Sequence, residues 1–110
     1  MRVYISGPIK ADTKEKEKEN VGRARSAMYE IMRRGHIPFC PHTMTENANI
    51  YAQDIQRDTF IKCDIEWLKL CDAILMLPGW EESEGANIEI EYAVMNGVKV
   101  FYNIDDIPLE

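Results

Sequence analysis

A short apolar run that ends at a proline constrains the fold of this chain more than any other feature. The run Ile-Leu-Met-Leu stops at Pro78, which cannot continue a central strand, so we expect a buried strand over residues 73–77. A polar loop follows, and a helix is predicted over residues 85–96, with Ser83 as its N-cap and Gly97 just beyond its end. A strand, loop and helix in this order direct free backbone N–H groups and the positive end of the helix dipole at a ligand above the sheet.

The rest of the sequence alternates between strand-like and helix-like segments. Further strands are predicted over residues 2–6, 36–40 and 99–103, and helical spacing of apolar residues extends over residues 21–32 and 51–70. The order β-α-β-α-β-α-β predicts one α/β domain over residues 1–110. We expect a three-layer, flavodoxin-like (Rossmann-like) domain with a four-stranded parallel sheet of strand order 2-1-3-4.

Three segments carry no clear core pattern. The charged residues 10–20 are interpreted as a solvated loop and the first turns of a helix, where Asp12 and Glu15 resemble a capping box. Residues 43–49 are expected to form a polar loop, and residues 105–110 a tail.

The predicted strand order places a ligand crevice between the first and third strands. These strands are then neighbours, and ligands bind at the carboxyl ends of such strands, where the strand order reverses. The two loops at this point are rich in glycine and hydroxyl groups. We expect substrate contacts from Ser6, Gly7, Pro8, Ile9, Gly79, Trp80, Ser83 and Gly85.

Charge and composition disfavour several classes of partner. A net charge of −6 argues against binding a nucleic acid polymer, which needs a basic surface, but it permits a small phosphate-bearing ligand. No apolar run is long enough to span a membrane, so we expect a soluble cytoplasmic protein with no membrane partner. The three cysteines lack metal-binding spacing, and His36 and His42 are interpreted as structural. Neither a metal nor another cofactor is expected.

The candidate catalytic groups are isolated carboxylates rather than a signature motif. The sequence lacks the Walker A, G-x-G-x-x-G and G-x-S-x-G motifs, which disfavours P-loop hydrolysis, Rossmann-type dinucleotide binding and α/β-hydrolase chemistry. Glu89 and Glu91 are two residues apart on the predicted helix, so only one of them can face the crevice. Near the first turn, the helix dipole favours ionised Glu89, which suits a nucleophile. The alternative is that Glu89 only decorates a solvated helix N-terminus.

Three other polar residues have structural explanations as well. Asp72 comes just before a buried strand and is typical of a cap or turn residue. Asp64 can face the crevice if its helix runs antiparallel beneath the loop after the third strand, which periodicity alone does not show. Tyr4 lies within a strand covered on both faces, where a core aromatic with its hydroxyl at an edge is the simpler interpretation.

Three stretches, taken together, resemble the nucleoside 2-deoxyribosyltransferase superfamily. They are Val-Tyr-Ile-Ser-Gly-Pro-Ile from Val3, Cys-Asp-Ile-Glu-Trp-Leu-Lys-Leu-Cys-Asp-Ala-Ile from Cys63, and Ser-Glu-Gly-Ala-Asn-Ile-Glu-Ile-Glu-Tyr-Ala from Ser83. The superfamily includes 2′-deoxynucleoside 5′-monophosphate N-glycosidases and many small members often carried by phages. The resemblance extends from residue 2 to about residue 103.

This resemblance implies a role for six residues. Glu89 would be the nucleophile that attacks the sugar C1′ and forms a glycosyl-enzyme ester. Asp64 would bind sugar hydroxyls or assist proton transfer, and Tyr4 would orient the nucleophile. Ser83 would contact a 5′-phosphate, while Gly7 and Gly85 would keep the backbone close to the ligand.

The resemblance also implies a function and an assembly. The chain would be an enzyme that cleaves or transfers the N-glycosidic bond of a (deoxy)nucleoside or nucleoside 5′-monophosphate. It would form a homodimer or larger homo-oligomer, with Trp80 and the second helix as candidate subunit contacts. The sequence departs from its relatives in its shorter length and in Glu91, where relatives commonly carry glycine. A non-catalytic nucleotide-binding or sensor module and a purely structural or interaction domain remain alternatives.

Overall fold

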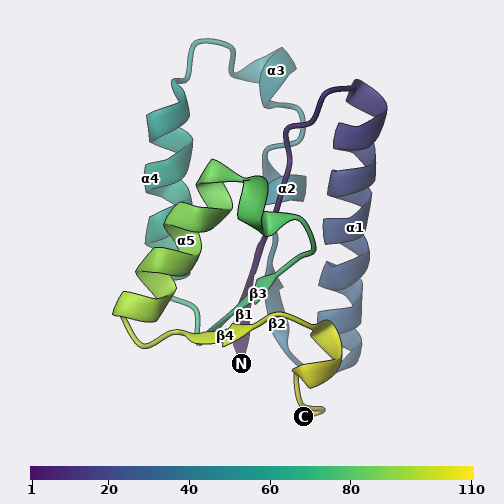
Figure 1. Ribbon diagram of the computed structural model, residues 1–110, viewed down its shortest axis with the longest axis vertical. Helices are drawn as coiled ribbons and strands as arrows, with labels where there is room; N and C mark the ends of the chain where they lie inside the picture. Colours follow the sequence, from purple (N-terminus) through teal and green to yellow (C-terminus); the bar gives the residue numbers. More distant parts are fainter.

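Four parallel strands form a central sheet in the order β2-β1-β3-β4 (Figure 1). The computed structural model describes residues 1–110 and confirms the predicted strand order. The strands are β1 (Arg2–Ser6), β2 (Ile37–Phe39), β3 (Ala73–Met76) and β4 (Lys99–Phe101). The central position of β1 aligns Tyr4 with Phe39 on one side and Ile74 on the other.

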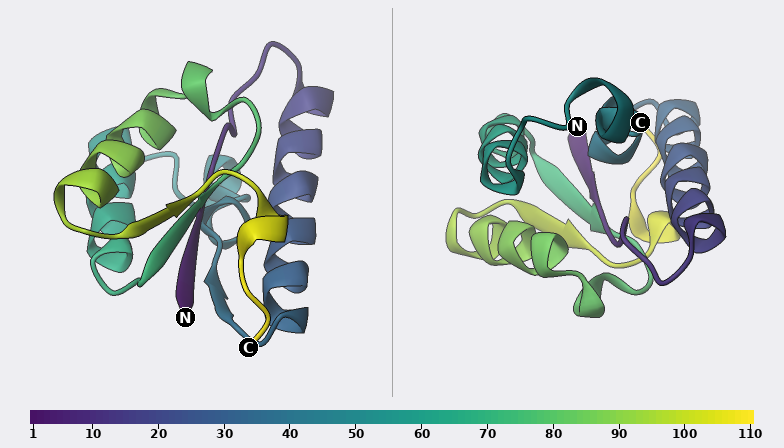
Figure 2. Two further views of the ribbon diagram at one scale, coloured as in Figure 1. Left: turned by 60° about the horizontal axis from the view of Figure 1, so that its bottom comes forward. Right: turned by 90° about the horizontal axis from the view of Figure 1, so that it is seen from above.

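Helices cover both faces of the sheet, so the predicted three-layer architecture is confirmed (Figure 2). The helices are α1 (Lys14–Arg33), α2 (Pro41–Met44), α3 (Ala48–Tyr51), α4 (Arg57–Leu68) and α5 (Glu84–Met95), with short 3₁₀ turns η1 (Trp80–Glu82) and η2 (Ile104–Asp106). Helix α1 packs on one face of the sheet, and α4 and α5 pack on the other. The short helices α2 and α3 lie in the connection between β2 and α4.

The alternation of side chains along β1 separates two hydrophobic cores. Val3 and Ile5 belong to the core under α1, whereas Tyr4 belongs to the core under α4 and α5. Because successive strand residues point to opposite faces, Ser6 shares the face of Tyr4. The sequence of β1 therefore directs two hydroxyl groups towards α4 and α5, and both residues are fully buried.

The ends of α5 follow the predicted capping signals, but the start of α1 does not. The hydroxyl oxygen of Ser83 accepts a hydrogen bond from the amide of Ala86, and Gly97 has a positive φ of 72° after the helix. Helix α1 is capped by Thr13, which accepts from the amide of Lys16, rather than through the box proposed at Asp12. Thr13 is one residue closer to the first helical turn.

Three predicted boundaries were wrong. The expected polar loop at residues 43–49 contains the second half of α2 and the first half of α3, two short helices without the apolar periodicity that would predict them. The predicted helix over residues 51–70 is shorter, because α4 begins only at Arg57. The expected tail is anchored, since Ile107 is buried in the core under α1.

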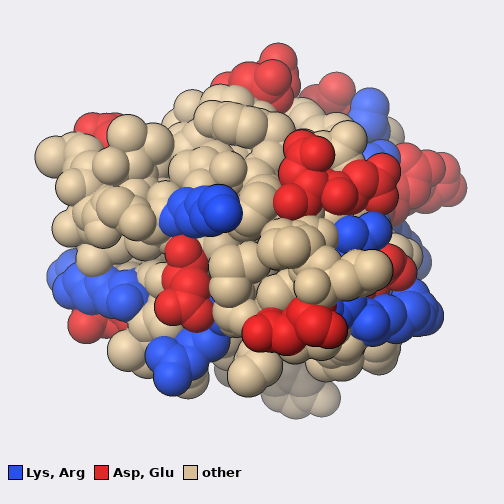
Figure 3. Space-filling view, turned by 90° about the horizontal axis from the view of Figure 1, so that it is seen from below, with Lys and Arg blue, Asp and Glu red and all other residues tan.

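The face at the amino ends of the strands carries interspersed acidic and basic side chains (Figure 3). No large single-sign patch dominates this face. No helix combines the length and apolar character required to cross a membrane. The carboxyl ends of the strands lie at the opposite end of the molecule (Figure 1).

Candidate functional site

The carboxylate of Glu89 is held by two hydroxyl groups from β1. The Tyr4 phenol donates a hydrogen bond of 2.5 Å to Oε2 of Glu89, and the Ser6 hydroxyl donates one of 2.6 Å to Oε1. Tyr4 and Ser6 are two residues apart and so share one face of the strand. Both oxygens of Glu89 are therefore oriented, and the carboxylate lies at the carboxyl end of β1, against the α5 layer.

Burial, rather than the helix dipole, controls the ionisation of Glu89. Burial raises the pKa of Glu89 to about 7, the hydrogen bonds from Ser6 and Tyr4 lower it, and the charge of Asp64 raises it further. The prediction that the helix dipole favours ionised Glu89 was wrong, because α5 begins at Glu84 and Glu89 falls in its second turn, where the dipole effect is weak. Glu91 is exposed, so only Glu89 of the pair faces inward.

Tyr4 remains a hydrogen-bond donor over the physiological pH range. Burial raises the pKa of its phenol, and the neighbouring charges of Glu89 and then Asp64 raise it further. The alternative interpretation, a core aromatic with its hydroxyl at an edge, describes the ring correctly but not the role of the hydroxyl. The ring packs in the core, with its centroid 5.6 Å from that of Phe39, while the hydroxyl contacts the Glu89 carboxylate.

Asp64 faces the same group of side chains from α4. Its charge acts on both Glu89 and Tyr4, and burial raises its own pKa to about 6. The first residues of α4 and α5 are also in contact, because Arg57 forms an ion pair of 3.3 Å with Glu84. Helix α4 therefore approaches α5 beside the site. Asp72 lies elsewhere, at the start of β3, where it accepts a hydrogen bond from the amide of Arg2.

The two glycine-containing loops contact each other. A Cβ on Gly7 would lie 2.8 Å from Cβ of Leu77, so this position accepts no side chain without a shift. Gly79 has a φ of 89°, which favours glycine, and a Cβ there would lie 3.3 Å from the ring of Pro8. Through these contacts the loop after β1 packs against the loop after β3, at the carboxyl ends of the two strands. Ile9, beyond Pro8, is exposed.

The remaining predicted contacts differ in what they do within the protein. The Ser83 hydroxyl caps α5, which leaves its proton free to donate to a ligand. Trp80 is half-buried and packs against Tyr102, with ring centroids 6.0 Å apart, so it serves at least to pack the loop. A Cβ on Gly85 would meet no atom within 4 Å, so this position faces open space.

His42 holds the loop after β1 and was interpreted from sequence only as structural. Its Nε2 lies 3.2 Å from the carbonyl oxygen of Pro8, which can only accept, so Nε2 carries the proton. Nδ1 is buried and has no hydrogen-bond partner, and burial lowers the pKa of the ring. The only sequence signal is a polar residue two positions after a predicted strand. No group of three or more His, Cys, Asp or Glu residues is arranged to hold a metal ion.

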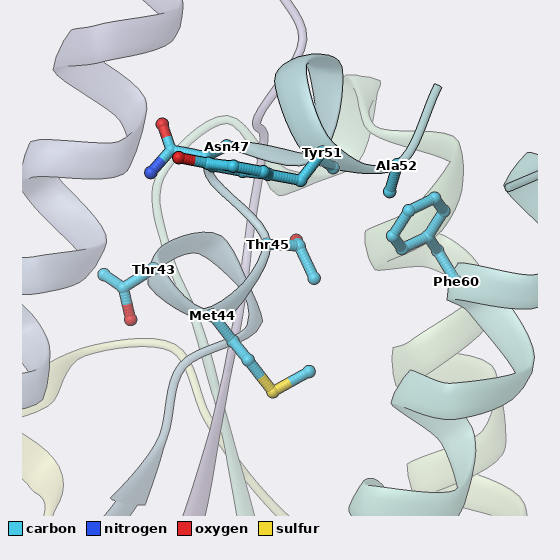
Figure 4. A pocket seen from close by; sticks show the side chains of 8 residues that line it. Thr43, Met44, Thr45, Asn47, Tyr51, Ala52 and Phe60 are labelled. Atoms are coloured by element: carbon cyan, nitrogen blue, oxygen red, sulfur yellow. The ribbon is translucent and has the colours of Figure 1, made fainter. Parts of the chain in front are cut away.

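Two open cavities lie against α4. One of about 360 Å³ lies on the outer side of α4, lined by Glu66, Trp67, Lys69 and Leu70. The other, of about 340 Å³, lies between the β2–α4 connection and the first turn of α4 (Figure 4). Its eight lining residues come from 43–60, a segment that the sequence did not identify as part of a site.

Comparisons with known proteins give a family and a fold. A family model described as a domain of unknown function, DUF4406, matches residues 1–102. No curated protein sequence matches the chain. Among solved structures, the fold resembles that of a 2-deoxyribosyltransferase from the psychrotolerant bacterium Bacillus psychrosaccharolyticus, with a TM-score of 0.65 and 19% identity over 91% of this chain and 69% of that chain. At this identity the likeness shows a shared fold.

Proposed function

The chain belongs to the DUF4406 family, and we propose that it cleaves or transfers the N-glycosidic bond of a (deoxy)nucleoside or nucleoside 5′-monophosphate. The observation that carries the proposal is the Glu89 carboxylate, oriented by Tyr4 and Ser6 at the switch point of the sheet. The fold that the chain shares with a 2-deoxyribosyltransferase supports the same class of reaction.

The proposed first step breaks the bond between the sugar and the base. The ionised carboxylate of Glu89 attacks C1′, the C1′–N bond breaks, and its electron pair leaves with the base. An adjacent carboxylate stabilises the oxocarbenium-like transition state of such a reaction and then traps it as an ester. With a pKa of about 7, Glu89 is ionised in about half of the molecules at neutral pH.

The leaving base needs a proton, and Asp64 is the candidate donor. Its pKa of about 6 leaves a protonated fraction near neutral pH, as a general acid requires. In the second step, water attacks C1′ of the ester and yields the free sugar, or a second base attacks and yields a new nucleoside. Either step releases the Glu89 carboxylate.

Tyr4 and Ser6 support the nucleophile through hydrogen bonds to its charged form. Two hydroxyl donors stabilise the carboxylate against the cost of burial and fix its direction. The Ser83 hydroxyl and the open space at Gly85 offer room for the 5′ end of the sugar beside the first turn of α5. A helix N-terminus favours a phosphate there.

The decisive experiment measures free base. The protein is incubated with a panel of deoxynucleosides, ribonucleosides and their 5′-monophosphates, and released base is quantified by chromatography. Base release should fall at least about a thousandfold in Glu89→Gln, as expected for loss of a nucleophile. The matched control is Glu91→Gln, two residues away on the exposed side of α5, which should retain wild-type rates.

Other outcomes would separate the alternatives. Thermal stabilisation by a nucleotide with no base released would reject catalysis and indicate a binding or sensor module. Equal activity in Glu89→Gln and Glu91→Gln would reject the assigned nucleophile. Neither binding nor turnover across the panel would favour an interaction domain. The proposed homo-oligomer is checked separately by light scattering on the purified protein.

A further inference from the structure

The cavity between the β2–α4 connection and α4 has the composition of a site for a planar ring. Its volume of about 340 Å³ lies at the lower end of the range for small-molecule pockets. It is lined by Thr43, Met44, Thr45, Asn47, Ala48, Tyr51, Ala52 and Phe60. A space of this size is large enough for one heterocycle.

The apolar part of the lining includes two aromatic rings and a thioether beside two alanines. Tyr51 and Phe60 approach the cavity from α3 and α4, and Met44 approaches from α2 (Figure 4). Tyr51 is 84% exposed and Met44 is 52% exposed, so both side chains are accessible to a ligand. Aromatic and thioether groups are the surfaces on which nucleobases stack and pack.

The polar groups of the lining differ in their availability. Thr43 and Thr45 already donate their hydroxyl protons to the carbonyl oxygens of Cys40 and Pro41. Asn47 occupies the N-cap position of α3, yet its side chain makes no capping hydrogen bond. Its amide therefore remains free at the rim, beside Tyr51 (Figure 4). A free side-chain amide provides a donor and an acceptor for the edge of a base.

Helix geometry joins this cavity to the carboxylates of the candidate site. Phe60 and Asp64 are four residues apart on α4, so their side chains are neighbours on one face of the helix. Asp64 in turn acts electrostatically on Glu89 and Tyr4. The cavity, the proton donor Asp64 and the nucleophile Glu89 therefore follow one another along this path. A bound substrate would place its base in the cavity, its glycosidic nitrogen near Asp64 and its C1′ near Glu89.

We propose that this cavity receives the heterocyclic base of the substrate, with Tyr51 and Phe60 as its apolar walls and Asn47 contacting the edge of the base. The inference rests on the proposed function and assigns a site to one part of its substrate. The sugar then extends from Asp64 towards Glu89, and its 5′ end towards Ser83.

The test separates base binding from sugar binding and from turnover. The affinities of free adenine, guanine, cytosine and thymine, and of 2-deoxyribose 5-phosphate, are measured by ligand-observed NMR titration. Tyr51→Ala should weaken binding of the preferred base about tenfold or more, as expected for loss of a stacking ring. The binding of 2-deoxyribose 5-phosphate should be unchanged. The control is Tyr29→Ala, an exposed tyrosine on α1, which should leave both affinities unchanged.

Asn47→Ala provides a second, independent readout. It should reduce the ratio of affinities between the preferred base and the others, because the edge contact is lost while the stacking ring remains. Tyr51 is largely exposed and the Asn47 side chain makes no capping hydrogen bond, so neither change threatens folding.

Several results would overturn the inference. Base binding that is equal in Tyr51→Ala and Tyr29→Ala, or absent in the wild type, rejects the base site even if nucleosides are cleaved. A change of oligomeric state in Tyr51→Ala with unaltered base affinity shows that the cavity is instead a contact between copies of the chain. Conversely, base binding that depends on Tyr51, without base release from any nucleoside, supports the site and rejects the proposed turnover.

Discussion

The phenol oxygen of Tyr4 lies 2.5 Å from Oε2 of Glu89, although the two residues are 85 positions apart in the chain. The contact connects the central strand β1 with the second turn of α5. It places a neutral donor against a carboxylate whose pKa burial raises and this hydrogen bond lowers. The proposed nucleophile therefore depends on a residue that also belongs to the hydrophobic core.

Tyr4→Phe should reduce kcat about tenfold to a hundredfold while leaving the fold intact, since the ring remains and only the hydroxyl is removed. The hydrogen bond lowers the pKa of Glu89, so its loss should move the acid limb of the rate profile to higher pH. Kinetics over a pH series would show both effects. A lower kcat without a shifted limb would indicate that Tyr4 orients Glu89 without tuning its ionisation.

The dependence of kcat/KM on pH should be bell-shaped, with a maximum near pH 6.5. The active form has Glu89 ionised and Asp64 protonated, and the two groups have pKa values of about 7 and about 6. Because the groups interact, the two limbs report the pair rather than single residues. In Asp64→Asn the alkaline limb should disappear, at a rate reduced about a hundredfold or more. An unchanged alkaline limb would assign Asp64 to sugar binding.

As the pH rises, the free energy of unfolding of the wild type should fall relative to that of Glu89→Gln. Folding raises the pKa of Glu89 from its ordinary 4.5 to about 7, so the folded state binds its proton more tightly. The resulting stabilisation is complete below about pH 4.5 and is lost as the pH rises through about 7, a difference of about 3 kcal/mol. Urea unfolding at pH 5 and pH 8 measures it. A constant difference between the variant and the wild type would show that Glu89 titrates normally.

Ser83→Asp should discriminate between nucleosides and their monophosphates. Aspartate is as good an N-cap as serine, so α5 should keep its stability. The new negative charge should repel a 5′-phosphate and raise KM for a monophosphate about tenfold or more, with little effect on the nucleoside. Steady-state kinetics with a matched substrate pair make the comparison. Equal effects on both substrates would remove Ser83 from the proposed phosphate contact.

Local sequence signals predicted much of the scaffold. The alternation of predicted strands and helices along the whole chain led to the sheet order, because parallel crossover rules leave few topologies and flavodoxin-like folds share this one. Ser83 and Gly97 marked the ends of α5, since caps act through neighbouring backbone groups. The segment at residues 43–60 was misread, because its short helices lack a periodic apolar face of their own.

The sequence by itself determined that Tyr4 and Ser6 share one strand face and that only one of Glu89 and Glu91 can face the sheet, because these depend on fixed periods of two and 3.6 residues. Only the tertiary structure decided that these groups meet, that Asp64 joins them from α4, and that the pKa of Glu89 is raised rather than lowered. Desolvation depends on every element packed around a group. It is therefore a property of the assembled fold, while the helix dipole considered from the sequence is a property of one helix.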